Sequence, residues 1–333
     1  MKFETFIGID VSKKTFDVAI SFDSVDLKHS RYVNDVSGVK SFLKELRQHK
    51  VVIKKCLVCL EHTGIYTHIL LKHLHSKGAN IWLEQALNIK RSLGVQRGKN
   101  DKVDSMRIAQ YAQRFQDKVT LWQPARKEIA RLKNLISLRE RLVRVKKSLA
   151  TPLGELIEAN SDAKNYIKKL TRPVIEKMSS QIIKIEHQIN QLIKNDKHLN
   201  RLEEIITSVD GVGKITAWQV IATTNEFKDF KGSRQFACYS GVVPFDHSSG
   251  TSIYSKPRVS HVANKRMKEL LHMSALSATI MKGELNDYYQ RKVAEGKNKM
   301  LVLNNIRNKL VQRIFSCVKE NRKYEKIYTS TLA

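Results

Sequence analysis

Two short apolar runs near the N-terminus, separated by the polar residues 12–15, constrain the fold more than any other stretch. The first run, residues 5–9, leads directly into Asp10, and the second covers residues 16–22. Such runs on either side of a polar turn predict a β-hairpin with a buried first strand. Strands are depleted in Asp, and a buried charge is costly unless it is paired or bound to metal. Asp10 therefore needs a chemical explanation.

The N-terminal third predicts alternating strands and helices. Besides the hairpin, the pattern predicts strands at residues 30–33, 56–60 and 79–83, and helices at about 35–48, 65–76 and 101–115. The run at 56–60 is continuously apolar, as in a strand buried on both faces, and it ends at Glu61. Three strands, a helix and then alternating strands and helices is the order of an α/β RNase H-like (RuvC-like) domain.

Four acidic residues fall where this order brings them together. Asp10 ends the first strand and Glu61 ends the fourth, while Asp101 and Asp104 share one face of a helix. Four carboxylates suit two divalent cations, which activate an attacking oxygen and stabilise a leaving oxygen on phosphate. We expect two Mg²⁺ ions, with Mn²⁺ as the alternative. For Asp101 and Asp104 alone, a helix N-cap and a first-turn acid explain the pair equally well.

The charge of the chain predicts a polyanionic partner. The 333 residues include 60 Lys and Arg against 32 Asp and Glu, a formal net charge of +28. Nucleic acid is the usual partner for such an excess. The sequence contains no apolar run of about 18 residues, which a membrane span would need. It also lacks the apolar core of a signal peptide. We therefore expect a cytoplasmic, nucleoid-associated protein, and the absence of a phosphate-binding glycine loop argues against an ATP motor.

Two long amphipathic helices are predicted in the middle of the chain. The first covers about residues 126–149, and residues 125–150 contain nine Lys or Arg and two Glu. Pro152, Gly154 and Pro173 predict a break after it. The second helix has apolar residues at alternating spacings of three and four, which is a heptad seam: Ile175, Met178, Ile182, Ile185, Ile189 and Leu192. This seam suits either a hairpin within one chain or a coiled coil between subunits.

The C-terminal part predicts contacts with a phosphate backbone. Residues 206–217 have the pattern of a helix-hairpin-helix, in which Gly211 and Gly213 let the backbone approach a phosphate beside Lys214. A plain turn between helices is the alternative. Residues 245–252 predict a surface turn by composition alone, and helices are predicted at about 264–281 and within 284–325.

Several blocks of the sequence carry a family resemblance. They are Gly8–Lys13, Glu61–Tyr66, Lys99–Ser105, Val209–Gly213, Tyr239–Pro244 and Ser248–Gly250. Together they resemble the insertion-sequence 110 family of DEDD transposases, the bridge-RNA-guided DNA recombinases of bacterial mobile elements. The resemblance covers nearly the whole chain. It implies that Asp10, Glu61, Asp101 and Asp104 are the metal-binding acids and that Ser249, or its neighbour Ser248, is the nucleophile.

The resemblance also implies a domain organisation and a mechanism. We expect a RuvC-like domain at 1–123, a helical coiled-coil region at 124–200 and a mostly α-helical transposase domain at 201–333. The serine would attack a DNA phosphate and hold a covalent link while strands exchange, in a site to which both end domains contribute. The implied partners are DNA at the element ends and target, a bridge RNA and further copies of the chain in a dimer or tetramer.

One block departs from the family pattern. His261 and Ala263 replace a Lys and a Gly of the family, in a segment that also contains Arg258, Lys265 and Arg266. We expect these three basic residues to contact nucleic acid.

Two other functions remain open on sequence alone. The first is a RuvC-like, metal-dependent, structure-specific endonuclease of the Holliday-junction-resolvase type, in which water replaces the serine. The second is a non-catalytic nucleic-acid scaffold. The presence of Ser248–Gly250 favours a transposase over the nuclease. The four acids favour either enzyme over the scaffold.

Overall fold

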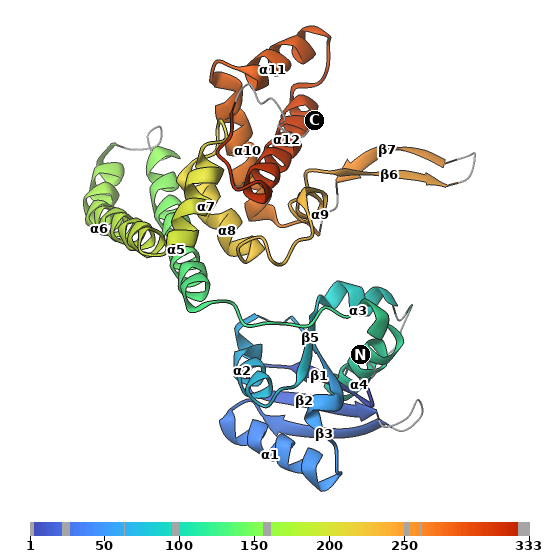
Figure 1. Cartoon of the computed structure of the whole chain (residues 1–333). Coiled ribbons are helices and arrows are strands. Elements are labelled where there is room, and N and C mark those ends of the chain that lie inside the picture. The colour runs from blue at the N-terminus through green and yellow to red at the C-terminus, as the bar shows by residue number, and fades with distance from the viewer. Residues whose placement is uncertain are drawn as a thin grey trace. The chain divides into compact units, whose positions relative to one another are not determined.

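The computed structural model describes residues 3–21, 27–62, 64–92, 94, 100–155, 161–249, 253–259 and 262–325. The chain divides into two compact units, residues 1–124 and 125–333, and each is described by itself (Figure 1). The expected division into three domains, with boundaries after residues 123 and 200, stays a prediction.

The first unit is built on a five-stranded mixed sheet in the order β3-β2-β1-β4-β5. Its strands are β1 (Thr5–Val11), β2 (Thr15–Ser21), β3 (Leu27–Val33), β4 (Cys56–Glu61) and β5 (Asn80–Glu84). The first three pair antiparallel, whereas β4 is parallel to both β1 and β5. The predicted strands are confirmed to within three residues at each end, and so is the expectation that the first and fourth are neighbours.

Helices and short 3₁₀ turns connect and cover these strands. The α-helices are α1 (Val36–Gln48), α2 (His68–Ser76), α3 (Ala86–Ser92) and α4 (Asp101–Arg114). The 3₁₀ turns are η1 (Ile53–Lys55), η2 (Gly64–Thr67) and η3 (Gln116–Lys118). Helices α1, α2 and α4 agree with the predicted ones, whereas α3 was not predicted.

The central strands have two buried faces, because successive side chains point to opposite sides of a sheet. One face packs against α1 and α2 through Ile7, Ile9, Val58 and Leu60. The other packs against α4 through Phe6, Leu57, Cys59 and Trp82. Residues two apart share a face, so Asp10 and Glu61 lie on the side that α4 covers.

Gly8 allows α4 to lie very close to β1. A Cβ atom at this position would lie 2.2 Å from both the backbone nitrogen of Ala109 and the carbonyl oxygen of Ser105. A glycine in a strand often marks such a close approach of another backbone. Because Asp101 and Asp104 precede Ser105 by no more than four residues, Gly8 also sets how near these acids lie to Asp10.

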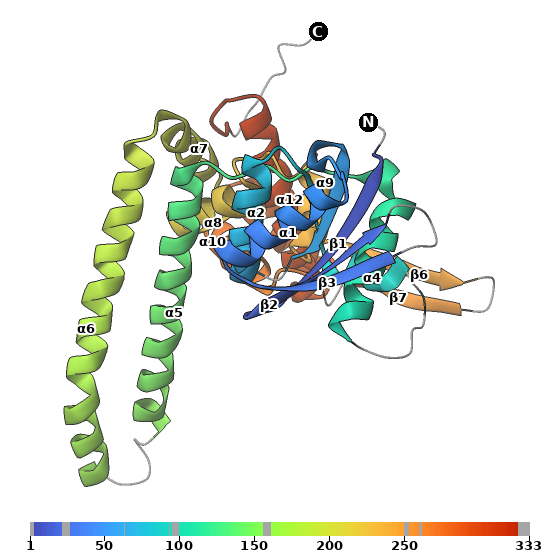
Figure 2. The ribbon, with the colours of Figure 1, turned by 90° about the horizontal axis from the view of Figure 1, so that it is seen from below.

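The second unit starts with two long helices, α5 (Lys127–Glu155) and α6 (Ser161–Lys194), which Figure 2 shows side by side. The N-terminal part of α5 packs against the C-terminal part of α6. A buried cluster there contains Ile129, Leu132 and Ile136 of α5 and Ile185, Ile189 and Ile193 of α6. The seam therefore packs within one chain, as the hairpin interpretation predicts. A coiled coil between subunits stays a prediction.

The prolines do not break these helices as predicted. Pro152 lies in the last turn of α5, and Pro173 lies inside α6, which begins at Ser161. An interior proline removes one backbone donor and costs about 3 kcal/mol. Pro173 is exposed, and the apolar seam that follows it packs against α5. Tertiary packing of that seam outweighs the local penalty.

The rest of the second unit is mostly helical. Its helices are α7 (Lys197–Thr207), α8 (Lys214–Thr224), α9 (Ser233–Tyr239), α10 (Lys265–Ile280), α11 (Glu284–Ala294) and α12 (Lys299–Lys319). Val209 and Val212 in the turn between α7 and α8 are buried in the common core. Among the described helices, no segment combines the length and the hydropathy of a membrane span.

The expected surface turn at residues 245–252 is wrong for the part that the structure describes. Strands β6 (Pro244–Ser249) and β7 (Ile253–Val259) form an antiparallel pair, which Figure 1 shows extending from the helices of this unit. Ile253, Tyr254 and Val259 favour extended backbone. The Ser-rich β6 takes the same conformation because β7 supplies its hydrogen-bond partners. Residues 250–252 lie outside the described part of the chain.

Candidate metal centre and nucleic-acid interface

A row of carboxylates crosses the central strands of the first unit. Asp17 pairs with Asp10 across β2 and β1, and Glu61 pairs with Glu84 across β4 and β5. The residues before Asp10 and Glu61 are also paired, so these two acids are neighbours. Residues directly opposite in a sheet point to the same face. The row therefore contains two predicted ligands and two acids, Asp17 and Glu84, that the sequence analysis missed.

Asp101 and Asp104 come from the first turn of α4. The N-cap of this helix is Asn100, whose side chain accepts a hydrogen bond from the backbone N–H of Lys102 at 2.9 Å. The alternative in which Asp101 is the N-cap is therefore wrong. Both acids still lie where a helix dipole favours negative charge.

The Asp10 carboxyl is affected by the other acids around it. Its pKa is raised from 3.8 to about 6, first by burial and then by the negative charges of Glu61, Asp101, Asp104 and Asp17. Neighbouring charges shift a pKa this way only over short distances. Glu61, Asp101 and Asp104 thus lie within electrostatic range of Asp10, and a cation beside Asp10 would relieve the repulsion.

Two arginines neutralise part of this acidic cluster. Arg31 on β3 donates from Nε to both carboxylate oxygens of Asp17, at 3.1 and 3.0 Å, and from Nη2 to Asp101 at 3.1 Å. Arg107 donates to Asp104 at 2.9 Å. The sequence did contain a signal that Asp17 needs a partner, but not which residue supplies it. Asp17 lies inside an apolar strand and needs a partner by the same reasoning as Asp10.

The donor set fits a hard cation, but the present side-chain arrangement does not yet form a metal site. Within the described ranges, no three Asp, Glu, His or Cys side chains are placed to hold one ion together. Asp101 and Asp104 would have to exchange Arg31 and Arg107 for the metal. All donors offered are carboxylate oxygens, which Mg²⁺ and Mn²⁺ prefer over softer metals.

The predicted nucleophile lies in the second unit, at the end of β6. The backbone of Ser249 pairs with Ile253 and that of Ser248 with Tyr254, next to the hairpin tip. Arg258 pairs with Phe245 near the base of the same hairpin. The two serines are thus adjacent residues on one strand, and the backbone does not favour either one as the nucleophile.

The two glycines of the α7–α8 turn differ in what they do. Gly211 has a positive φ of 82°, and a Cβ there would lie 2.5 Å from the carbonyl oxygen of Ser274 on α10, so packing explains this glycine. Gly213 is the N-cap of α8, with no atom within 4 Å of a Cβ. Lys214 is exposed, and its Nζ donates to Asn190 at 3.3 Å. A phosphate contact at this helix N-terminus stays a prediction.

The two basic residues at the start of α10 also differ. Lys265 is exposed. Arg266 donates from Nε to Glu140 of α5 at 2.6 Å and from Nη1 to Glu269 at 2.9 Å. Arg266 therefore ties α10 to α5 within the chain, and Lys265 offers its charge at the surface.

Comparisons with known proteins cover both units. The family described as "Transposase IS116/IS110/IS902 family" matches residues 203–290. The DEDD transposase family of IS110 elements, described as "Transposase", matches residues 7–158, which include all four predicted metal ligands.

Three relatives extend these matches. The "Pilin gene-inverting protein" of Moraxella bovis is 25% identical over 330 residues, which cover 97% of this chain and 98% of the relative. The "Transposase for insertion sequence element IS1328" of Yersinia enterocolitica is 22% identical over 89% of each chain. The "Transposase for insertion sequence element IS1111A" of Coxiella burnetii is 25% identical over 47% of this chain and 48% of the relative. With both units matched in this way, the chain belongs to the IS110 family of transposases, which are DNA-recombining enzymes.

Proposed function

We propose that this transposase cuts and rejoins DNA at the ends of an insertion sequence and at a target through a covalent link between Ser249 and a DNA phosphate. Asp10, Glu61, Asp101 and Asp104 would hold divalent metal ions for this reaction, with two Mg²⁺ ions as the expected complement. The observation that carries the proposal is the position of Glu61, Asp101 and Asp104 around the partly buried Asp10, whose pKa is raised to about 6 by burial and then by their charges. Carboxylates that repel one another in this way are suited to bind cations.

The proposed chemistry is an exchange of phosphate esters. The Oγ of Ser249 attacks the phosphorus, a new P–O bond to serine forms, and the bond to the 3′-oxygen breaks. The serine proton ends on the leaving 3′-oxygen, so the number of ester bonds is unchanged. Rejoining reverses the step with the 3′-hydroxyl of another strand. Divalent metal ions supply charge stabilisation for the attacking and leaving oxygens when they are bound.

Because the number of phosphate ester bonds does not change, the proposed reaction needs no ATP. The energy of the cut phosphodiester is kept in the serine ester, and the sequence has no phosphate-binding loop for ATP. In the proposal a bridge RNA reads the DNA sequence by base pairing. Support for a long nucleic-acid surface comes from exposed basic residues along α5: Lys127, Arg131, Lys133, Arg141, Arg144 and Lys147.

The proposal includes a dimer or tetramer that holds two DNA sites. The Moraxella bovis relative is named for inverting a gene, and inversion requires two sites to be cut and rejoined together. This relative matches nearly the whole chain, so the same reaction type is proposed here.

A denaturing gel tests the serine link. The full chain is incubated with DNA from its element end, the flanking RNA and Mg²⁺. Wild type is expected to form a slow-moving protein–DNA adduct, which Ser249→Ala and Asp10→Ala both abolish. Ser248→Ala is the matched control and should keep the adduct. Cut DNA without an adduct, unchanged by Ser249→Ala, would contradict the serine step. Loss of the adduct in Ser248→Ala but not in Ser249→Ala would move the nucleophile to Ser248.

A further inference from the structure

Arg307 on α12 is a buried cation that forms no ion pair with any described residue. The residue is 5% exposed, and its Nε is buried without a hydrogen-bond partner. Burial lowers its pKa, and in the described part of the chain no acidic neighbour opposes that shift. A buried guanidinium is costly unless an anion or other acceptors compensate it. The mechanism proposed above does not use this residue.

The helices that surround Arg307 contain further unpartnered polar atoms. Nδ1 of His272 on α10 is buried without a partner, and so is Oγ of Ser240, directly after α9. Burial and then the charge of Arg307 lower the pKa of His272, which places the two side chains near each other. Buried polar atoms without a protein partner on α10, on α12 and directly after α9 call for a polar group or water from outside the chain.

This junction leads to the strand that contains the predicted nucleophile. Asn304, one turn before Arg307, donates from Nδ2 to the carbonyl oxygen of Val242 at 2.9 Å. Val242 lies two residues before the start of β6. On α10, Lys268 lies beside Gly241, since a Cβ at Gly241 would lie 3.6 Å from its Cδ. The junction of α10 and α12 therefore joins the base of the β6–β7 hairpin.

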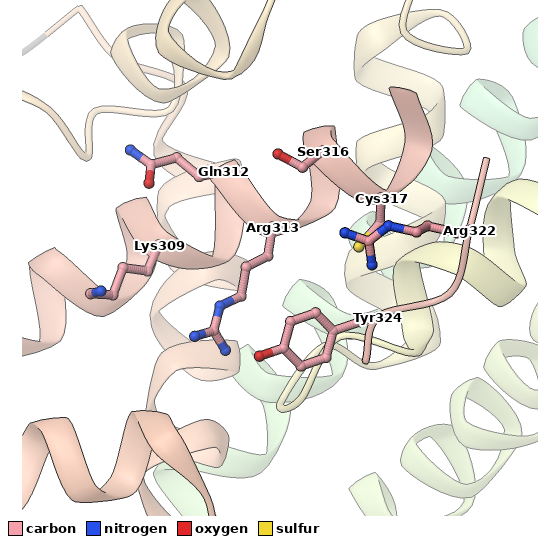
Figure 3. Close-up of a pocket in the computed structure, with 7 residues that line it drawn as sticks. All are labelled: Lys309, Gln312, Arg313, Ser316, Cys317, Arg322 and Tyr324. Carbon is pink, nitrogen blue, oxygen red and sulfur yellow. The ribbon is translucent and has the colours of Figure 1, made fainter. Parts of the chain in front are cut away.

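The cations on the other side of α12 differ from Arg307, because most of them have acidic partners. Figure 3 shows Lys309, Arg313 and Arg322 around a pocket of about 200 Å³. Arg313 is paired with Glu284 at 2.5 Å, and Arg322 is paired with Glu320 at 2.5 Å. Two of the three charges are thus balanced within the chain and need no external anion.

We propose that Arg307 is the centre of an anion site at the α10–α12 junction, which takes a phosphodiester group of a bound nucleic acid. The inference rests on the proposed function and adds a contact near the hairpin base. A guanidinium offers a planar set of donors that matches phosphate oxygens. Lys268 and the unpartnered Nδ1 of His272 are available as further polar partners. Asn304 and Asn308 on the same helix are only partly buried, so the surface lies close to Arg307 along α12.

Substitution of Arg307 by methionine tests the inference, since it removes the charge and keeps most of the volume. Lys309→Met is the matched control, because it removes the same charge two residues away on the other side of α12. The full-length proteins are titrated with a fluorescent DNA duplex and a single-stranded RNA at several salt concentrations. Their melting temperatures are measured with and without inorganic phosphate.

Arg307→Met is expected to raise the melting temperature of the free protein, because an uncompensated buried charge is gone. It should also weaken nucleic-acid binding about tenfold and reduce the salt slope by about one. Phosphate should stabilise wild type more than Arg307→Met. Lys309→Met should leave the melting temperature and the phosphate response close to those of wild type. An effect on DNA alone or on RNA alone identifies the backbone that supplies the phosphate.

Other outcomes would overturn the inference. A lower melting temperature with unchanged binding makes Arg307 a structural residue. A higher melting temperature with unchanged binding but lost self-association assigns the anion to a carboxylate of a second copy of the chain. If wild type binds neither DNA nor RNA, the proposed function fails, and that result is distinct from equal binding by wild type and Arg307→Met.

Discussion

Asp10→Asn is expected to make the metal-free protein more stable at pH 8 while it reduces recombination by at least about 10³-fold, since metal ions supply several kcal/mol of transition-state stabilisation. The first effect follows from the pKa of Asp10, which is raised to about 6 by burial and by Glu61, Asp101 and Asp104. Forcing this carboxyl to ionise opposes folding. An asparagine of nearly the same shape removes that cost.

The sign of the pH dependence follows from the same shift. Between pH 3.8 and about 6 the folded protein holds a proton on Asp10 that the unfolded chain has lost. The free energy of unfolding therefore falls as pH rises through this window and is level above it. The full shift corresponds to about 3 kcal/mol, and solvent screening of this partly exposed group reduces it to roughly 1–2 kcal/mol. Wild type and Asp10→Asn should be equally stable near pH 4 and differ at pH 8.

Urea unfolding at both pH values, with and without Mg²⁺, measures this effect. Mg²⁺ should stabilise wild type at pH 8 and affect Asp10→Asn much less, because a ligand that binds only the folded state shifts the equilibrium towards it. Asp17→Asn is a matched control with the opposite sign. Asp17 is 2% exposed and is hydrogen-bonded to Arg31 and His29, so loss of its charge should destabilise the folded protein. An Asp10→Asn protein less stable than wild type at pH 8 would contradict the electrostatic account.

The strand order and the position of two acids were predictable because each rests on a local pattern. A continuous apolar run followed by Glu61 identifies a buried strand and its end, and the same reasoning applies to Asp10. What joins these ends is the parallel pairing of β1 with β4, which the RNase H-like order predicts and the structure confirms. The metal-binding role of these acids, by contrast, stays a prediction.

The partners of the acids were not predictable, because they depend on register between distant segments. Arg31 on β3 contacts both Asp17 and Asp101. Asp101 lies 70 residues after Arg31 in the sequence. No spacing rule places an arginine of one strand against the first turn of a later helix. The β6–β7 hairpin was missed for a related reason, since the Ser-rich β6 becomes a strand only by pairing with β7.

Gly8→Ala is expected to destabilise the protein by about 3 kcal/mol or more and to reduce recombination strongly. The added Cβ would lie 2.2 Å from backbone atoms of Ser105 and Ala109, and backbone atoms cannot rotate away as a flexible side chain can. Helix α4 would have to move from β1 by roughly 1 Å to restore normal contact. Overpacking of this kind usually costs about 1–3 kcal/mol, and a contact between two backbones belongs at the upper end or beyond.

The same displacement moves Asp101 and Asp104 away from Asp10, so stability and activity should fall together. Equilibrium unfolding and the protein–DNA adduct assay measure the two effects on the full chain. Gly232→Ala is the matched control, since no atom lies within 4 Å of a Cβ there and its φ of 175° is open to any residue. A Gly8→Ala protein with wild-type stability would mean that α4 does not lie this close to β1. A Gly8→Ala protein that is destabilised but fully active would show that recombination does not depend on the close packing of α4 against β1. The distance of Asp101 and Asp104 from Asp10 would then not limit the reaction.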